Sequence, residues 1–68
     1  MKYEVILYWS EVDERYIAFM PELAGCMADG LTPEEALAHI QSVAKEWLET
    51  ARDLGRTIPE PRGRLNYA

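Results

Sequence analysis

The chain has 68 residues, a formal net charge of −5, one cysteine and one histidine. A single cysteine excludes a disulfide within the chain, and a single histidine far from it gives no ligand spacing for a metal site. A chain this short holds one domain, residues 1–68, and a small domain without either support usually depends on oligomerisation.

The charge is unevenly distributed along the chain. Residues 1–54 hold 4 basic and 11 acidic side chains, whereas residues 55–68 hold 3 basic and 1 acidic. An acidic body repels phosphate backbones, so it disfavours nucleic-acid binding and favours a basic protein partner. A negative surface also simply keeps a small protein soluble, and this second interpretation stays open. No run of residues resembles a signal peptide or a membrane span, which predicts a cytoplasmic protein.

Two strands are predicted at the start of the chain. Residues 2–10 are rich in β-branched and aromatic side chains, and a hairpin turn follows in the charged residues 11–15. Residues 16–20 form the second strand, which ends at Pro21 because proline cannot donate to a ladder. At period two the first strand presents one wholly hydrophobic face, made of Tyr3, Val5, Leu7 and Trp9.

Two turns and a short strand are predicted before the helix. The first turn runs from Pro21 to Gly25, where glycine is free to adopt a positive φ. Residues 26–28 are short and apolar and form the third strand. Asp29 and Gly30 close this strand with a second turn.

A long helix is predicted from Pro33 to about Leu54. Thr32 and Glu35 fit a capping box, in which Thr32 accepts from the amide of residue 35 and Glu35 reaches back to the amide of Thr32. Pro33 suits the first helical position, and Gly55 is the expected C-cap. One apolar stripe recurs at helical spacing, through Leu37, Ile40, Ala44, Trp47, Leu48, Ala51 and Leu54.

These elements predict an α+β fold in which a three-stranded antiparallel sheet packs one face on one long helix, in the order β-β-β-α. Residues 63–68 either add a short fourth strand or remain loose. A single helix covers one face of the sheet, so we expect the other face to be apolar and exposed, which is typical of an interface. The residues predicted to bind a partner there are Ile6, Tyr8, Ile17, Phe19 and Glu22.

The sequence offers little catalytic chemistry. Its four glycines are isolated, so no phosphate-binding loop occurs. Ser42 follows His39 by three residues, without a recognisable oxyanion site, and Cys26 lacks a nearby base or cation. Cys26 is better explained as a small buried hydrophobe, and Trp9 and Trp47 as core side chains rather than the lining of a pocket. We therefore expect no catalytic residue, no metal and no cofactor.

One enzymatic alternative stays open. Asp13, Glu22 and Asp29 lie in turns or near strand ends, where converging carboxylates would bind a divalent cation for nuclease chemistry. Charged turns are more often simply solvated, so this alternative ranks below a binding function.

The stretch from Tyr16 to Ala36 resembles the HicB antitoxin family. That family typically shows an aromatic-rich strand, then Pro-[Asp/Glu]-Leu-x-Gly-Cys, then Gly-[Asp]-Thr-x-x-Glu-Ala at the start of a helix. Leu31 stands where the family often has Asp or another polar residue. The matching residues of this chain are Pro21, Glu22, Leu23, Gly25, Cys26, Gly30, Thr32, Glu35 and Ala36.

The resemblance implies a partial ribonuclease-H-like fold and a small basic RNA-cleaving toxin as partner, whose active site the antitoxin covers. Many HicB proteins add a C-terminal DNA-binding segment, for which a chain that stops at Ala68 has no room, so we expect toxin binding without DNA binding. The alternative is an orphan homo-oligomer, a dimer or tetramer with a regulatory or unknown role. The motif residues expected to be structural are Pro21, Gly25, Cys26, Gly30, Thr32 and Glu35.

Overall fold

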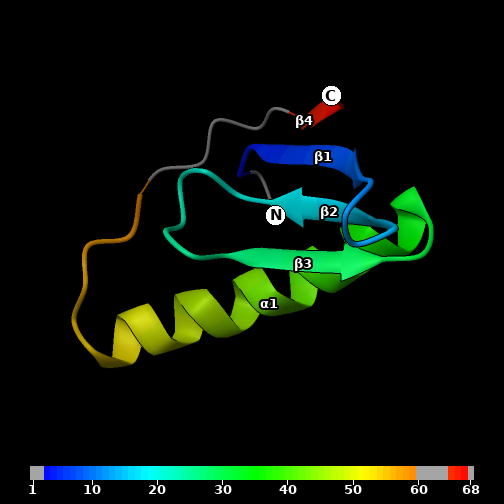
Figure 1. The fold of residues 1–68 in the computed structure, drawn as a ribbon. Helices are drawn as coiled ribbons and strands as arrows, with labels where there is room; N and C mark the ends of the chain where they lie inside the picture. Colours follow the sequence, from blue (N-terminus) through cyan, green and yellow to red (C-terminus); the bar gives the residue numbers. More distant parts are fainter. Residues whose placement is uncertain (1–2, 60–64, 68) are drawn as a thin grey trace.

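The structure, a computed structural model, describes residues 3–59 and 65–67. Its elements confirm the α+β class and the order β-β-β-α, and a short fourth strand is present near the C-terminus (Figure 1). In chain order they are β1 (Val5–Ser10), β2 (Arg15–Phe19), β3 (Met27–Gly30), α1 (Pro33–Asp53) and β4 (Leu65–Tyr67).

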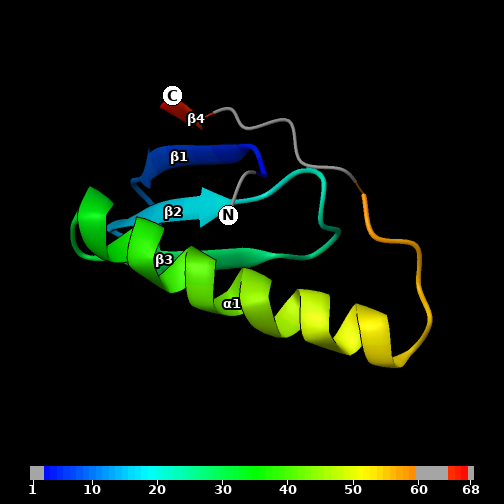
Figure 2. The same ribbon diagram turned by 180° about the vertical axis from the view of Figure 1, so that it is seen from behind.

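The strands form one mixed sheet in the order β3-β2-β1-β4. β1 pairs antiparallel with β2, and β2 pairs antiparallel with β3. β4 pairs parallel with β1, with Val5 opposite Leu65. A parallel pair needs a crossover connection, and α1 provides it by carrying the chain back along the sheet before β4 begins. The helix runs along one side of the sheet, crossing β3 (Figure 2).

The first hairpin is closed by the four residues 11–14. Arg15, expected in the turn, is instead the first residue of β2 and pairs with Ser10. The Ser10 hydroxyl donates to Asp13 Oδ2 at 3.0 Å and accepts from the Asp13 amide at 3.3 Å. Glu14 adopts φ +52°, a left-handed conformation that lets a four-residue loop return to the strand direction.

The third strand lies further along the chain than the sequence predicts. It was expected over 26–28, but Asp29 and Gly30 belong to it and pair with Ile17 and Tyr16. The Asp-Gly pair is a local turn signal, and pairing with β2 overrides it. Gly30 is needed for another reason: a Cβ there would lie 2.5 Å from the backbone nitrogen of Ala36, at the start of α1.

The core lies between α1 and the inner face of the sheet. Trp9 and Leu54 were predicted to belong to it, but Trp9 is 45% exposed and Leu54 63% exposed. The reason is the path of the helix: α1 packs mainly against β3, touches β1 least, and has ended where Leu54 lies. The buried core residues are Tyr3, Leu7, Ala18, Met20, Leu23, Cys26, Ala36, Ile40 and Ala44.

Both ends of α1 are capped by local contacts. The Glu35 amide donates to Thr32 Oγ1 at 3.1 Å, which is one half of the predicted capping box; between these two described residues the reverse bond is not formed. Leu54 is the C-cap, and Gly55 follows it at φ +69°. The Arg56 amide donates to Ala51 O at 2.8 Å, which completes a Schellman motif. Within the described residues, no helix has the length and apolar character needed to cross a membrane.

Candidate protein-binding surface

The sheet presents a second apolar face on the side away from α1, which we call the outer face. Its side chains alternate with the core residues along each strand, because successive residues of a strand point to opposite sides. Pairing brings Tyr8 beside Ile17 and Ile6 beside Phe19. None of the described helices or strands covers this face (Figure 1). The outer face consists of Ile6, Tyr8, Ile17, Phe19 and Met27.

The outer-face side chains shield one another from solvent. Ile17, at the centre, is only 9% exposed, although it faces away from the helix. The rings of Tyr8 and Phe19 pack edge to face with centroids 6.2 Å apart, and both are half-buried. Met27 is 53% exposed at the β3 edge. The sequence-predicted apolar residues of the site therefore form one contiguous patch rather than separate exposed side chains.

Charged groups border the outer face at both ends. Arg15 and Asp29 form an ion pair at 3.5 Å with both side chains about half exposed. Glu22, also predicted to contact a partner, lies in the loop after β2, where its Oε1 accepts from the Glu4 amide at 2.9 Å. The second oxygen, Oε2, is buried without a hydrogen-bond partner. Glu22 therefore holds the start of the chain, a contact for which the sequence gives no signal.

The matched motif forms a compact loop between β2 and β3. Its backbone closes on itself through Met20 N to Cys26 O at 3.1 Å and Cys26 N to Leu23 O at 3.0 Å. Gly25 adopts φ +78°, and the Leu23 side chain is fully buried. Cys26 is buried as well, and this burial raises the pKa of its thiol. These residues shape the loop, and Leu23 and Cys26 fill part of the core.

The acidic residues considered for nuclease chemistry do not form a metal site. Asp13 is engaged by Ser10 in the hairpin, Asp29 by Arg15, and Glu22 by the Glu4 amide. Among the described residues no group of three His, Cys, Asp or Glu side chains is placed to hold a metal ion. The structure therefore does not bring Asp13, Glu22 and Asp29 together.

His39 holds the helix to the sheet. Its Nδ1 lies 2.7 Å from the backbone oxygen of Asp29, so the proton of the bond resides on Nδ1. Helical spacing places Glu35 one turn before His39, on the same side of the helix. A partner on a strand cannot be found from helical spacing, so this contact was missed.

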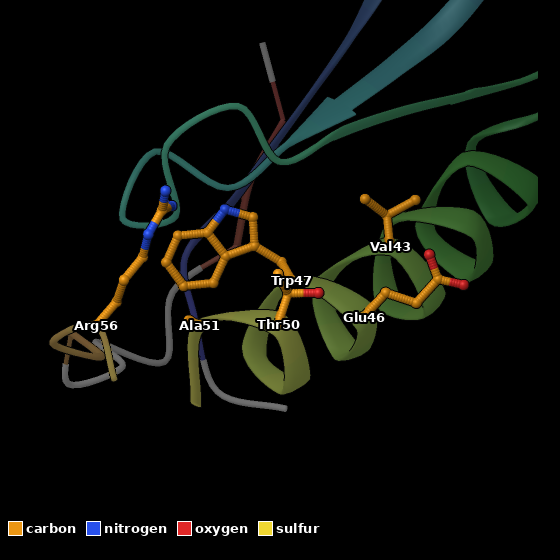
Figure 3. Close-up of a pocket in the computed structure, with 6 residues that line it drawn as sticks. All are labelled: Val43, Glu46, Trp47, Thr50, Ala51 and Arg56. Carbon is orange, nitrogen blue, oxygen red and sulfur yellow. The ribbon is translucent and has the colours of Figure 1, made fainter. Parts of the chain in front are cut away.

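A shallow hollow lies beside the C-terminal half of α1 (Figure 3). Its volume is about 250 Å³, below the range of roughly 300–1,000 Å³ typical of small-molecule sites. Trp47 forms its wall and is held by a bond from its indole Nε1 to Ala24 O at 2.9 Å. Trp47 packs against the core, as the sequence predicts, but it also lines this hollow, which the sequence did not predict. The lining residues are Val43, Glu46, Trp47, Thr50, Ala51 and Arg56.

Comparison with known proteins identifies relatives over most of the chain. No protein-family model matches it, and no solved structure matches it. The UPF0150 protein ssl0259 of Synechocystis sp. is 36% identical over 59 residues, which cover 87% of this chain and 80% of that protein. The UPF0150 protein Ta0767 of Thermoplasma acidophilum is also 36% identical over 59 residues, covering 87% of this chain and 84% of the relative. These names state no activity. At this identity and coverage, the chain belongs to the UPF0150 family.

Proposed function

We propose that the chain is a cytoplasmic protein-binding module of the HicB antitoxin type, which neutralises a small basic RNA-cleaving toxin by covering its active site. The observation that carries this proposal is the outer face, a contiguous apolar patch that no described element covers. Apolar patches on small soluble domains generally mark an interface. The chain itself performs no catalysis in this proposal.

Two further features support the same function. The stretch that resembles HicB antitoxins folds into the compact loop between β2 and β3 and the capped start of α1, as a structural motif should. The net charge of −5 suits a basic partner, because complementary potentials speed encounter and disfavour wrong partners.

The size of the molecule is compatible with steric inhibition. A standard protein interface buries about 800 Å² on each partner. The accessible surface of this chain is 4700 Å², so such an interface takes up about a sixth of it. The surface of this chain is therefore large enough to include an interface of standard size.

An RNA-cleavage assay tests the proposal. The proposal predicts that a small basic ribonuclease is encoded beside the gene for this chain, and that protein is purified and mixed with increasing amounts of the chain. We expect the wild type to abolish cleavage near equimolar ratio and Phe19→Lys to bind about tenfold more weakly or worse, because the substitution puts a charge in the apolar patch. The matched control is Gln41→Lys, the same charge change on an exposed position of α1.

The proposal is wrong if the wild type leaves cleavage unchanged, or if no ribonuclease is encoded there. Circular dichroism and thermal unfolding of both variants establish that they fold. If Phe19→Lys and Gln41→Lys inhibit equally, a toxin does not bind through the outer face.

A second candidate function, an orphan homo-oligomer with a regulatory role, is favoured by the charge balance of the outer face. One end of its border carries the Arg15–Asp29 ion pair, whose charges offset each other, so two copies can meet at that end without repulsion. Sedimentation equilibrium tests this candidate: the wild type should form a dimer or tetramer and Phe19→Lys a monomer. A wild type that stays monomeric at millimolar concentration removes it.

A further inference from the structure

Exposed apolar side chains gather at one end of the molecule, which we call the hairpin end. Val12, in the loop between β1 and β2, is 95% exposed, Leu31 is 62% exposed and Trp9 is 45% exposed. The β1–β2 loop and the start of α1 lie at this same end in both views (Figures 1 and 2). Trp9 lies near the end of β1, Val12 in the loop after it and Leu31 directly after β3, so three large exposed apolar side chains belong to neighbouring segments at this end.

Local contacts hold the hairpin end in place. The ring of Trp9 packs edge to face on Tyr16 with centroids 5.0 Å apart. Tyr16 pairs with Gly30, so Leu31 follows directly from the strand residue beside that aromatic pair. The turn that carries Val12 is fixed by the two hydrogen bonds between Ser10 and Asp13. A partner therefore meets a patch that is already ordered, which lowers the entropy cost of binding.

The charge of the hairpin end is one-sided. Val12 is flanked by Glu11, Asp13 and Glu14, all exposed, and the neighbouring Arg15 is neutralised by Asp29. The backbone of Glu14 has a left-handed conformation that glycine or asparagine adopts more easily, yet this position carries an acidic side chain. The outer face, by contrast, is bordered at one end by the Arg15–Asp29 ion pair and at the other by the single carboxylate of Glu22. Of these two surfaces, the hairpin end carries the larger excess of negative charge, which favours a basic partner there.

We propose that the hairpin end is the contact that selects a basic protein, with the three carboxylates attracting cationic side chains around an apolar centre of Trp9, Val12 and Leu31. The inference rests on the proposed function and identifies a charge-selective contact for it. Nucleic acid and anionic lipid are disfavoured as occupants, because both would bring negative charge against Glu11, Asp13 and Glu14. Once opposite charges have brought the partner close, burial of the apolar centre stabilises the complex.

An NMR titration of the full chain with a defined probe tests this surface. The probe is an eight-residue capped peptide of alternating Arg and Leu, added to ¹⁵N-labelled protein at low salt. We expect amide shifts concentrated in residues 9–14 and 31–34, and none with a peptide of alternating Glu and Leu. Glu11→Gln with Glu14→Gln should weaken binding about fivefold, as expected for two exposed ion pairs.

Matched variants separate this surface from general acidity. Glu46→Gln with Glu49→Gln makes the same charge change on exposed positions of α1 and should leave the affinity unchanged. Val12→Ser removes apolar contact without changing charge and should weaken binding. The inference is overturned if the peptide does not bind, if the shifts spread along α1, or if the two double variants weaken binding equally.

The same variants distinguish failure of this inference from failure of the proposed function. If Val12→Ser and the Glu11/Glu14 variant neutralise the ribonuclease as well as the wild type does, the hairpin end is not the contact, while the antitoxin function stands. If the peptide maps to the hairpin end but no ribonuclease is neutralised, the surface stands and the antitoxin function falls.

Discussion

At Gly30 the start of α1 comes so close to the sheet that no side chain fits between them. A Cβ at this position would lie 2.5 Å from the Ala36 nitrogen and 2.9 Å from the carbonyl carbon of Glu35, both in the backbone. Backbone cannot move aside as a flexible side chain does, so Gly30→Ala must push the helix off the strand. We expect the free energy of unfolding in urea to fall by about 1–3 kcal/mol, the usual cost of overpacking.

Gly25→Ala is the control for this substitution. Nothing lies within 4 Å of a Cβ at Gly25, but its φ of +78° is strained for alanine. Its cost, about 1–2 kcal/mol, comes from backbone strain alone, so the position of α1 should not change. Amide chemical shifts of residues 30–37 should therefore move in Gly30→Ala and stay in place in Gly25→Ala. Undisturbed shifts in Gly30→Ala would contradict the close approach of helix and strand.

The thiol of Cys26 has a raised pKa because burial disfavours its charged form. As the pH rises through the ordinary pKa of 9.0, the unfolded thiol ionises before the folded one, whose pKa is raised. Its contribution to stability is therefore full below that pH and is lost as the pH rises above it. We expect the difference in unfolding free energy between the wild type and Cys26→Ala to narrow above pH 9.

Thiol labelling gives an independent measure of the same burial. At pH 8 without denaturant, a disulfide reagent should label Cys26 slowly, and in concentrated urea it should label Cys26 at the rate of an unfolded peptide. Rapid labelling of the folded protein would mean that Cys26 is not enclosed by the loop between β2 and β3.

The hydrogen bond of Thr32 matters at the scale of the element, because it closes the first turn of α1. Thr32→Ala removes the acceptor for the Glu35 amide and should cost about 1 kcal/mol. For a domain of this size that lowers the melting temperature by about 4–8 °C. Thr32→Ser keeps an oxygen at the same place and should melt within about 2 °C of the wild type. Equal melting of the Ala and Ser variants would show that the bond does not stabilise the helix.

The bounds of α1 could be predicted to within one residue, because the signals at its ends are local. Thr32 and Pro33 define the start through short-range bonding, and Gly55 defines the end by adopting a positive φ. The exposure of Trp9 and Leu54 could not be predicted in this way. It depends on which strands the helix crosses, and helical or strand periodicity carries no information about that.

The sheet shows the same division between local and long-range information. The period of two places Ile6, Tyr8, Ile17 and Phe19 on one face, and the pairing of β1 with β2 brings them together. β4 pairs parallel with β1, and the crossover through α1 makes this direction possible. The three residues of β4 show no sequence pattern that predicts which strand they pair with. The contact of Glu22 with the Glu4 amide is equally non-local.

The hairpin end was missed although the sequence holds a signal for it. Val12 is a large apolar residue within a four-residue loop whose other members are acidic. A turn over residues 11–14 accounts for the reversal of the chain. It does not account for Val12, because a turn does not need an apolar side chain in solvent. The signal becomes visible once Trp9 and Leu31 are found exposed beside it.

At the scale of the whole molecule, one hydrogen bond joins the start of the described chain to the segment that follows α1. The Tyr3 hydroxyl donates to Pro59 O at 2.6 Å, across 56 positions of sequence. Tyr3 is also buried in the core, so its ring ties the segment after α1 to the start of the sheet. This segment leads toward β4, whose pairing with β1 completes the sheet.

Tyr3→Phe therefore tests how the fold is closed. The ring stays in the core while the bond to Pro59 is lost, which should cost about 1 kcal/mol and lower the melting temperature by about 4–8 °C. Amide hydrogen exchange should accelerate more in residues 55–58 than at the centre of α1, because the loss acts on the segment after the helix. Tyr16→Phe is the control, since within the described residues the hydroxyl of Tyr16 makes no hydrogen bond. Equal losses in the two variants would mean that the bond to Pro59 does not hold this segment to the sheet.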